Sequence, residues 1–274
     1  MRQISSNAEL AETPDPAPKS GGSQTLLRGL DVIEAMADGP LGLAELAARL
    51  GLTRSTTHRL ATALIERRYL TFVPRLGYHF GPKLLELGFL AQQQTDVVQL
   101  ARPHLEALAI GTEDTVHLGM RDGDRALYLD KIPGRRRVEI KSRVGDRHPL
   151  TLTGLGKALA LDDAPARWRQ LFDEDQANGS FPIAYAVWEQ RMQSYVASGY
   201  AFDLEENEDL IRCVAAPIRD VSGRIVAAIS VSSAAQYMDD ERMRALADDV
   251  RRTAGSVSAE LGFVHAPARA GRKG

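Results

Sequence analysis

The segment LAELAARLGLTRSTTHRL, residues 43–60, decides how the first part of this chain folds. Leu43–Leu50 consists of strong helix formers and predicts a short helix, and Gly51 follows where helices often end in a left-handed residue. Thr53 or a neighbour can then cap a further helix that runs to about Arg67. A short helix, a tight turn and a second helix together predict a helix-turn-helix unit.

The flanking sequence extends this unit on both sides. Upstream, residues 25–38 carry apolar side chains at helical spacing, and Gly39-Pro40 ends that helix. Downstream, residues 69–73 and 78–80 read as two short strands joined by a loop. A β-hairpin behind a helix-turn-helix is the wing of a winged helix, which we therefore expect over residues 23–82.

The helix that starts at Arg54 has the composition expected of a DNA-reading helix. Such a helix enters the major groove with its first turn toward the base edges, where arginine, serine and threonine can contact bases or phosphates. Thr57 lies on the inward side and belongs to the expected core. The candidate DNA contacts are Arg54, Ser55, Thr56, His58 and Arg59 on this helix, Arg75 at the hairpin tip, and Gln24 and Arg28 on the first helix. Surface arginines are often inert, and a winged helix can instead bind a protein.

The second half of the chain alternates between strand and helix patterns. One hairpin is expected over 115–132 around Asp122-Gly123, a strand over 138–144, and a second hairpin over 212–232. Helices are expected over 83–99, 154–161, 164–172, 186–198 and 239–261. Strand pairs followed by helices predict an α+β fold with an antiparallel sheet.

Composition and length set the frame for these elements. The 274 residues suffice for two domains, and the net charge of −2 means that DNA binding requires a local basic surface. The single cysteine, Cys213, and the lack of a long apolar run predict a cytoplasmic protein without a membrane segment. Six scattered histidines offer no zinc-ligand spacing, and no nucleotide-binding loop occurs, so no metal, no cofactor and no enzymatic activity are expected. The expected order is a disordered tail over 1–22, the winged helix, a linker helix over 83–99, a second domain over 100–262 and a flexible tail over 263–274.

Several short motifs, in this order and spacing, resemble the IclR family of bacterial regulators. In the first half these motifs are Leu30–Glu34, Leu43–Ala47 and Ser55–Leu60. In the second half they are Asp130–Ile132, Thr153–Ala158, Gly199–Asp203, Arg212–Ile218 and Ala227–Ser232. The resemblance implies a GAF-like effector-binding domain, a homodimer or dimer of dimers on double-stranded operator DNA, and a small, often carboxylate-bearing effector. It implies effector contacts at Gly154, Leu155, Asp203, Ile211, Cys213, Ser230 and Ser232.

The residues themselves support part of this effector site. On the strand over 224–232, alternation places Val226, Ala228, Ser230 and Ser232 on one face, and Ile225, Ala227, Ile229 and Val231 on a core face. Backbone amides over 154–156 open a helix and could hold an anion. His148 adds an adjustable donor where some relatives carry an apolar residue, which favours a polar effector such as a sugar acid.

Other interpretations remain open for these positions. The two serines could bond to neighbouring backbone, Cys213 could be a buried apolar residue, and Asp203 could cap the segment 205–210. The sequence predicts a ligand-responsive transcriptional regulator of a catabolic operon, either repressor or activator. The alternatives are a GAF-like small-molecule-binding or enzymatic module with an accessory helical domain, and a sensor that acts on a protein partner.

Overall fold

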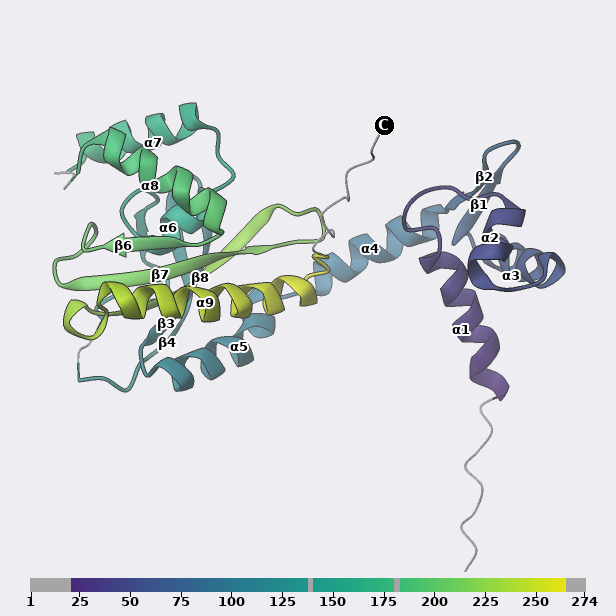
Figure 1. Cartoon of the computed structure of the whole chain (residues 1–274), viewed down its shortest axis with the longest axis horizontal. Helices are drawn as coiled ribbons and strands as arrows, with labels where there is room; N and C mark the ends of the chain where they lie inside the picture. Colours follow the sequence, from purple (N-terminus) through teal and green to yellow (C-terminus); the bar gives the residue numbers. More distant parts are fainter. Residues whose placement is uncertain (1–20, 138–139, 180–182, 265–274) are drawn as a thin grey trace, which may run out of the picture. The chain divides into compact units, whose positions relative to one another are not determined.

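A computed structural model describes residues 21–137, 140–179 and 183–264, which divide into two compact units between Gln94 and Thr95 (Figure 1). The first unit contains four helices and one hairpin among its described residues, and the second contains a large sheet with helices on both faces. The expected α+β fold class is confirmed. Each unit is described by itself below.

The first unit is a winged helix-turn-helix. Its elements are α1 (Gly21–Glu34), α2 (Leu43–Leu50), α3 (Arg54–Glu66), β1 (Leu70–Val73), β2 (Gly77–Phe80) and α4 (Pro82–Gln94). Gly51 has φ 63° and ends α2, and Thr53 caps α3 because its hydroxyl oxygen accepts from the Thr56 amide at 3.2 Å. The local signals in residues 43–60 therefore produce the turn that was expected from them.

A small apolar core holds the three helices and the hairpin together. It contains Val32, Met36, Leu46, Leu60, Ala61, Leu70 and Tyr78. Thr57 is fully buried beside them, as expected. The hairpin reaches the turn after α1 through backbone hydrogen bonds between Leu41 and Tyr78, and a Cβ at Gly77 would lie 2.4 Å from the Leu41 carbonyl oxygen. Glycine at position 77 therefore permits this close approach.

The structure corrects two expected boundaries in this region. The helix α1 begins at Gly21, inside the expected tail over 1–22, and residues 1–20 of that tail lie outside the described residues. The single helix expected over 83–99 is two helices, because α4 ends at Gln94 and α5 starts at Val97. Asp96 explains the break: its carboxylate caps α5 by accepting from the Val98 amide at 2.8 Å.

The second unit is built on a six-stranded antiparallel sheet in the order β5-β4-β3-β8-β7-β6. The strands are β3 (Thr115–Asp122), β4 (Arg125–Ile132), β5 (Arg147–Pro149), β6 (Ala201–Leu204), β7 (Ile211–Arg219) and β8 (Ile225–Ala234). The helices are α5 (Val97–Thr112), α6 (Gly154–Leu159), α7 (Pro165–Ala177), α8 (Tyr185–Ser198) and α9 (Asp240–Glu260), with a short 3₁₀ turn over Ala235–Tyr237.

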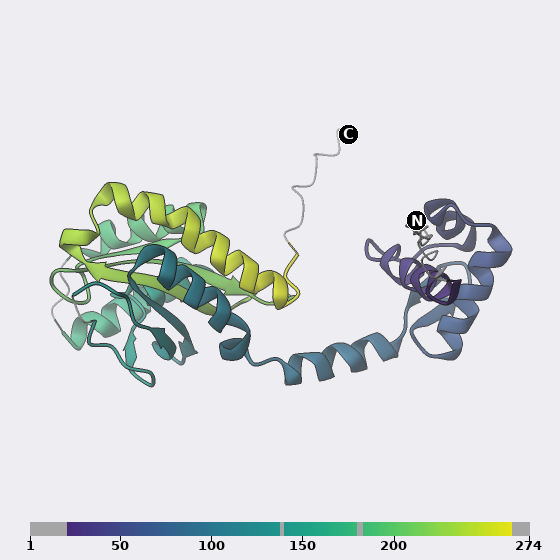
Figure 2. The ribbon, with the colours of Figure 1, turned by 90° about the horizontal axis from the view of Figure 1, so that it is seen from below.

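Two apolar cores lie on the two faces of this sheet. The helices α5 and α9 cover one face of the sheet (Figure 2). The core between these helices and the sheet contains Leu105, Leu118 and Val250. The opposite face carries α6, with α7 and α8 behind it, and a core that contains Leu155 and Trp188. The sheet is therefore buried on both sides, and a ligand site must be made where one covering layer is incomplete.

The strand expected over 138–144 is absent from the part of it that the structure describes. Residues 138 and 139 lie outside the described residues, 140–143 carry no regular structure, and the edge strand is β5 instead. Lys131 holds this segment in an irregular path, because its ammonium group donates to the carbonyl oxygens of Ile140 at 2.5 Å and Ser142 at 2.8 Å. The strand β6, which carries the motif residue Asp203, was not expected.

The face assignment along β8 is wrong at its first two residues. Ile225 packs with the core under α6, and Val226 packs with the core under α5 and α9, the reverse of the expectation. The pairing of β7 with β8 shifts register between Ile218 and Arg219, which inserts an irregularity before the regular alternation begins. From Ala227 onward the faces follow the expected alternation.

Candidate functional site

The first two turns of α3 present polar and cationic side chains to solvent. Arg54, Ser55, His58 and Arg59 are exposed, and Thr56 is partly exposed. The Thr53 hydroxyl lies at the centre of the first turn: it donates to Thr56 Oγ1 at 2.9 Å and lies 3.2 Å from Ser55 Oγ. These contacts hold three hydroxyl groups together on the same helix as the two exposed arginines, and both kinds of group can contact bases or phosphates in a groove.

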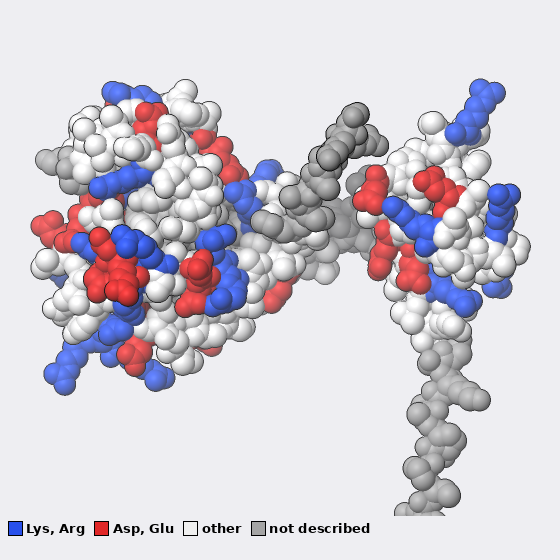
Figure 3. All heavy atoms as spheres, viewed as in Figure 1, with Lys and Arg blue, Asp and Glu red and all other residues white. Residues whose placement is uncertain are grey.

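The other DNA-contact candidates in this unit are also exposed. Arg75 has φ 70° at the tip of the β1–β2 hairpin, and Gln24 and Arg28 lie on the first turns of α1. In Figure 3, basic side chains gather at the side of this unit where α3 lies and at the hairpin tip. The structure thus leaves all eight candidates at least partly accessible to a partner.

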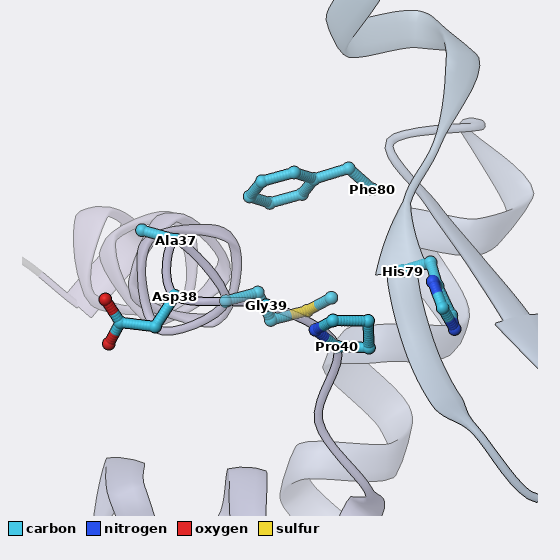
Figure 4. Close-up of a pocket in the computed structure, with 7 residues that line it drawn as sticks. Ala37, Asp38, Gly39, Pro40, His79 and Phe80 are labelled. Carbon is cyan, nitrogen blue, oxygen red and sulfur yellow. The ribbon is translucent and has the colours of Figure 1, made fainter.

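A pocket of about 410 Å³ lies in the first unit beside the turn after α1 (Figure 4). It is lined by Met36, Ala37, Asp38, Gly39, Pro40, His79 and Phe80. Asp38 lies across the pocket from His79, and its carboxylate pairs with Arg49 at 3.0 Å. The polar groups of this pocket therefore do not converge on one point. In the second unit, by contrast, polar groups do converge on one pocket.

The second unit contains a smaller cavity, of about 160 Å³, on the α6 side of its sheet. Each of the six strands contributes at least one side chain to its lining: His148 from β5, Tyr128 from β4, His117 from β3, Ser232 from β8, Cys213 from β7 and Asp203 from β6. The remaining lining residues come from loops and are Ile140, Lys141, Ser142, Asp146, Thr153, Asn207 and Glu208, with Ile211 at the start of β7. Many polar groups thus converge on one small space, which we call the effector pocket after the effector site that the sequence predicts.

An aromatic row forms one wall of the effector pocket. The ring centroids of His117 and Tyr128 are 5.0 Å apart, and those of Tyr128 and His148 are 4.8 Å apart. His117 Nε2 lies 2.7 Å from Ser142 Oγ, and His117 Nδ1 lies 3.5 Å from Ser232 Oγ. The hydroxyl partners fix the orientation of the His117 ring, while His148 Nε2 is buried without a hydrogen-bond partner among the described residues.

Five of the predicted effector residues line this pocket and three do not. His148, Asp203, Ile211, Cys213 and Ser232 line it. Leu155 is fully buried in the core beneath α6, and Gly154 lies behind the pocket, where a Cβ would approach Cys213 Sγ to 2.9 Å. Ser230 is fully buried, with its hydroxyl beside the Cys213 thiol.

The backbone amides expected to hold an anion are only partly available. The Gly156 amide donates to Thr153 Oγ1 at 2.9 Å, because Thr153 caps α6. The helix α6 is also only six residues long. Its start is therefore weaker as an anion site than the sequence indicated.

His117 and Tyr128 were missed because strand partners are not visible in a single sequence. Within the hairpin over 115–132, alternation places both residues on one face, but only the pairing of His117 with Ser230 brings that face to the pocket. The loop residues Lys141, Asn207 and Glu208 have no periodic pattern that could have identified them. The same holds for Ser142, Asp146, Thr153 and Ile140.

Burial shifts the pKa of the main titratable groups in the pocket. It lowers the pKa of His117 to about 3, with a further contribution from the Lys131 ammonium, and it lowers the pKa of His148. Burial raises the pKa of Asp203 to about 6, against the opposing effect of Lys157, and that of Cys213 to about 11. Both imidazoles are therefore neutral near pH 7, and the thiol is not ionised.

A buried ion cluster supports the loop that carries Asp203. Lys157 and Glu206, with side chains 1% and 2% exposed, form an ion pair, and Lys157 also donates to the Phe202 carbonyl at 3.0 Å. Arg191 of α8 joins them, with its guanidinium 2.6 Å from Glu206. Asp203 Oδ1 accepts from the Glu206 amide at 2.8 Å, so Asp203 both caps this turn and lines the pocket.

Comparison with known proteins places both units in one family. Residues 89–259 match the family described as the bacterial transcriptional regulator IclR C-terminal domain, and residues 25–74 match the IclR helix-turn-helix domain. This chain belongs to the IclR family of transcriptional regulators. The family resemblance found in the sequence is thus confirmed, and the chain carries a DNA-binding helix-turn-helix.

Relatives of this IclR-family regulator align with it over most of its length. The DNA-binding transcriptional repressor YiaJ of Escherichia coli K12 is 31% identical over 255 residues, which is 89% of this chain and 90% of YiaJ. The E. coli regulator XynR is 30% identical over 88% of this chain and 98% of its own. The crystal structure of the Agobacterium tumefaciens repressor BlcR is 27% identical, with a TM-score of 0.74 over 89% of this chain and 99% of that one.

These findings bear on the alternatives left open by the sequence. The relatives are all named as transcriptional regulators, which favours a regulator over the enzymatic alternative. Among the described residues, no cluster of three or more histidine, cysteine or carboxylate side chains is arranged to hold a metal ion. No helix in the described ranges is long and apolar enough to span a membrane.

Proposed function

We propose that this IclR-family regulator senses a small carboxylate metabolite, such as a sugar acid, in the effector pocket and controls a catabolic operon in response. The observation that carries this proposal is the convergence of at least one side chain from each of six strands on a cavity of about 160 Å³. Small-molecule sites are concave and contain a few polar groups placed to orient the ligand. The serine, asparagine and histidine side chains suit a ligand with several hydroxyl groups.

On the DNA side, we infer that the domain over residues 23–82 reads the operator through α3. Arg54 and Arg59 are the strongest candidates because both are exposed at the start of that helix. The remaining candidate contacts are Gln24, Arg28, Ser55, Thr56, His58 and Arg75. The phosphate contacts among them would make binding depend on salt concentration.

A homodimer, or a dimer of dimers, would present two such helices to successive half-sites. Exposed apolar side chains in the first unit support this proposal. Leu26 and Leu27 of α1 are 65% and 55% exposed, and Leu85 and Phe89 of α4 are 79% and 60% exposed. Large apolar side chains left exposed on two helices are typical of interaction sites.

Effector binding would alter the relative placement of the two recognition helices through the segment 83–99, which lies between the proposed DNA-binding and effector-binding domains. Such coupling requires unequal effector affinity for the DNA-competent and incompetent arrangements.

The test is a fluorescence-anisotropy titration of the full chain with DNA from its own promoter region, with an unrelated duplex as the reference. Promoter binding should weaken steeply between about 50 and 200 mM salt. A variant with Arg54→Ala and Arg59→Ala should lose the preference for promoter DNA, whereas Arg169→Ala, on exposed α7, should retain it. Equal binding of both duplexes by the unaltered protein would refute promoter recognition.

The effector is then sought with a panel of sugar acids, short keto acids and aromatic acids added to the same assay. A sugar acid that changes the DNA affinity would support the proposal, and a response to aromatic acids alone would refute the sugar-acid assignment.

A further inference from the structure

The effector pocket carries more acidic than basic groups. Its lining includes the carboxylates of Asp146, Asp203 and Glu208 but only one cation, Lys141. Lys141 and Glu208 are both exposed and lie where solvent screens them, whereas Asp203 is 4% exposed. The deepest charged group in the pocket is thus an acid, with no cation of the lining beside it in the interior.

Nearby cations are already engaged by other groups. Lys157 of α6, at the back of Asp203, pairs with Glu206 and the Phe202 carbonyl, and Arg191 of α8 pairs with the same Glu206. Lys131 of β4 donates to two backbone carbonyls of the loop 140–142. None of these three cations is left free to pair with a ligand.

The other groups that face Asp203 carry no positive charge. They are the phenols of Tyr128 on β4 and Tyr195 on α8, the thiol of Cys213 on β7 and the carboxylate of Glu206. Across the pocket, His117 of β3 and His148 of β5 are neutral near pH 7 because both are desolvated. An ionised carboxylate ligand would therefore be repelled by the ionised carboxylate of Asp203.

We propose that the effector pocket accepts its ligand without a net gain of negative charge, so that a hydroxyl-rich acid enters together with one proton. This inference rests on the proposed function. The proton comes from solvent and is held between one carboxylate oxygen of the ligand and one of Asp203; no covalent bond between heavy atoms forms or breaks. Two carboxyl groups that share a small site cannot both ionise, so one of them keeps its proton.

The state of Asp203 in the free protein fits this proposal. Burial raises its pKa to about 6, so protonation requires little free energy near neutral pH, and a nearby ligand carboxylate raises the pKa further. The protonated acid can donate a hydrogen bond to the ligand carboxylate, while its second oxygen still accepts from the Glu206 amide. Protonation therefore leaves the turn at 203–206 intact.

Isothermal titration calorimetry of the full chain tests the proposal with two matched probes, D-gluconate and D-glucitol, which differ in the carboxylate. Titrations at pH 7 in phosphate and in Tris, whose ionisation enthalpies differ, give the number of protons taken up. We expect close to one proton for D-gluconate and none for D-glucitol. The affinity for D-gluconate should fall about tenfold between pH 7 and pH 8, as expected for one linked proton.

Asp203→Asn is the decisive variant, because the asparagine amide can donate one hydrogen bond and accept another without taking up a proton from solvent. It should abolish proton uptake and make D-gluconate affinity independent of pH over this range. The exposed Asp173→Asn variant on α7 should behave like the unaltered protein.

Binding of D-gluconate without proton uptake would overturn the proposal, as would unchanged uptake in Asp203→Asn. If neither probe binds while another acid of the panel alters DNA affinity, the hydroxyl-rich, proton-linked assignment fails but effector sensing stands. If no acid binds or alters DNA affinity, effector sensing itself fails, and this inference fails with it.

Discussion

Replacing Glu206 by glutamine should strongly destabilise the second unit. The carboxylate of Glu206 is 2% exposed and neutralises the ammonium of Lys157, which is 1% exposed. In the variant, Lys157 keeps the Phe202 carbonyl at 3.0 Å but loses the one carboxylate with which it forms an ion pair among the described residues. Breaking a buried pair by removing one partner costs about 3–5 kcal/mol, because an uncompensated charge stays buried.

The reciprocal variants separate charge from shape. Lys157→Met leaves Glu206 paired with Arg191, whose side chain is 32% exposed, so its cost should lie at the lower end of that range. The double variant Lys157→Met with Glu206→Leu removes both buried charges, and Arg191 can turn toward water. Apolar replacement of a buried pair is often neutral or stabilising, so the double variant should be more stable than either single one.

The two tryptophans make this measurement specific to the second unit, because Trp168 and Trp188 both lie in its core. Their fluorescence during urea unfolding reports the free energy of unfolding of this unit. In thermal unfolding, a loss of about 3–5 kcal/mol should lower the midpoint temperature by about 6–20 °C. Arg169→Ala, in a pair whose side chains are 56% and 47% exposed, should cost less than about 1 kcal/mol. A Glu206→Gln variant within about 1 kcal/mol of the unaltered protein would refute the reasoning.

Three further outcomes are expected from local geometry. A Cβ at Gly156 would lie 2.6 Å from Leu150 Cα, so Gly156→Ala should lower the free energy of unfolding of the second unit, measured in urea. A Cβ at Gly255 would have nothing within 4 Å, so Gly255→Ala should raise that free energy by about 0.5–1 kcal/mol. Similar effects of the two substitutions would contradict this reasoning. Thr53→Ala should cost the first unit about 0.5–2 kcal/mol and weaken promoter binding, and Thr53→Ser should restore both, as measured by thermal unfolding and anisotropy. Because burial lowers the pKa of His117 to about 3, its contribution to stability is present above pH 6.5 and is lost as the pH falls toward 3. His117→Gln should flatten this acid-side loss in urea titrations between pH 7 and 4, and an unchanged slope would show that other groups cause it.

The winged helix was predictable because its signals are local. A left-handed residue such as Gly51 ends a helix, and a hydroxyl such as that of Thr53 starts one, whatever the rest of the chain does. The turn at Asp122-Gly123 defines its hairpin for the same reason. Features that depend on fewer than about ten neighbouring residues are thus visible in the sequence.

The effector pocket was only partly predictable because its walls come from distant segments. His117 and Ser232 lie more than a hundred positions apart, and their proximity depends on the pairing of β3 with β8. Lys131 bonds to the carbonyl oxygens of the loop 140–142, and residues 140–143 have no regular structure where alternation predicted a strand. A lysine side chain that replaces strand partners has no periodic signature.

The two ends of β8 show why alternation succeeded for the pocket and failed beside it. Alternation assigns faces correctly only while the pairing with the neighbouring strand stays in register. The irregularity opposite Ile218 and Arg219 reverses Ile225 and Val226, but register is continuous from Ala227 to Ala234. Ser230 and Ser232 lie in that continuous stretch, so both hydroxyls reach the α6 side of the sheet, beside Cys213. The side of the sheet on which the two serines lie therefore depends on where the irregularity falls: one more residue of slippage would turn both serines into the core under α5 and α9.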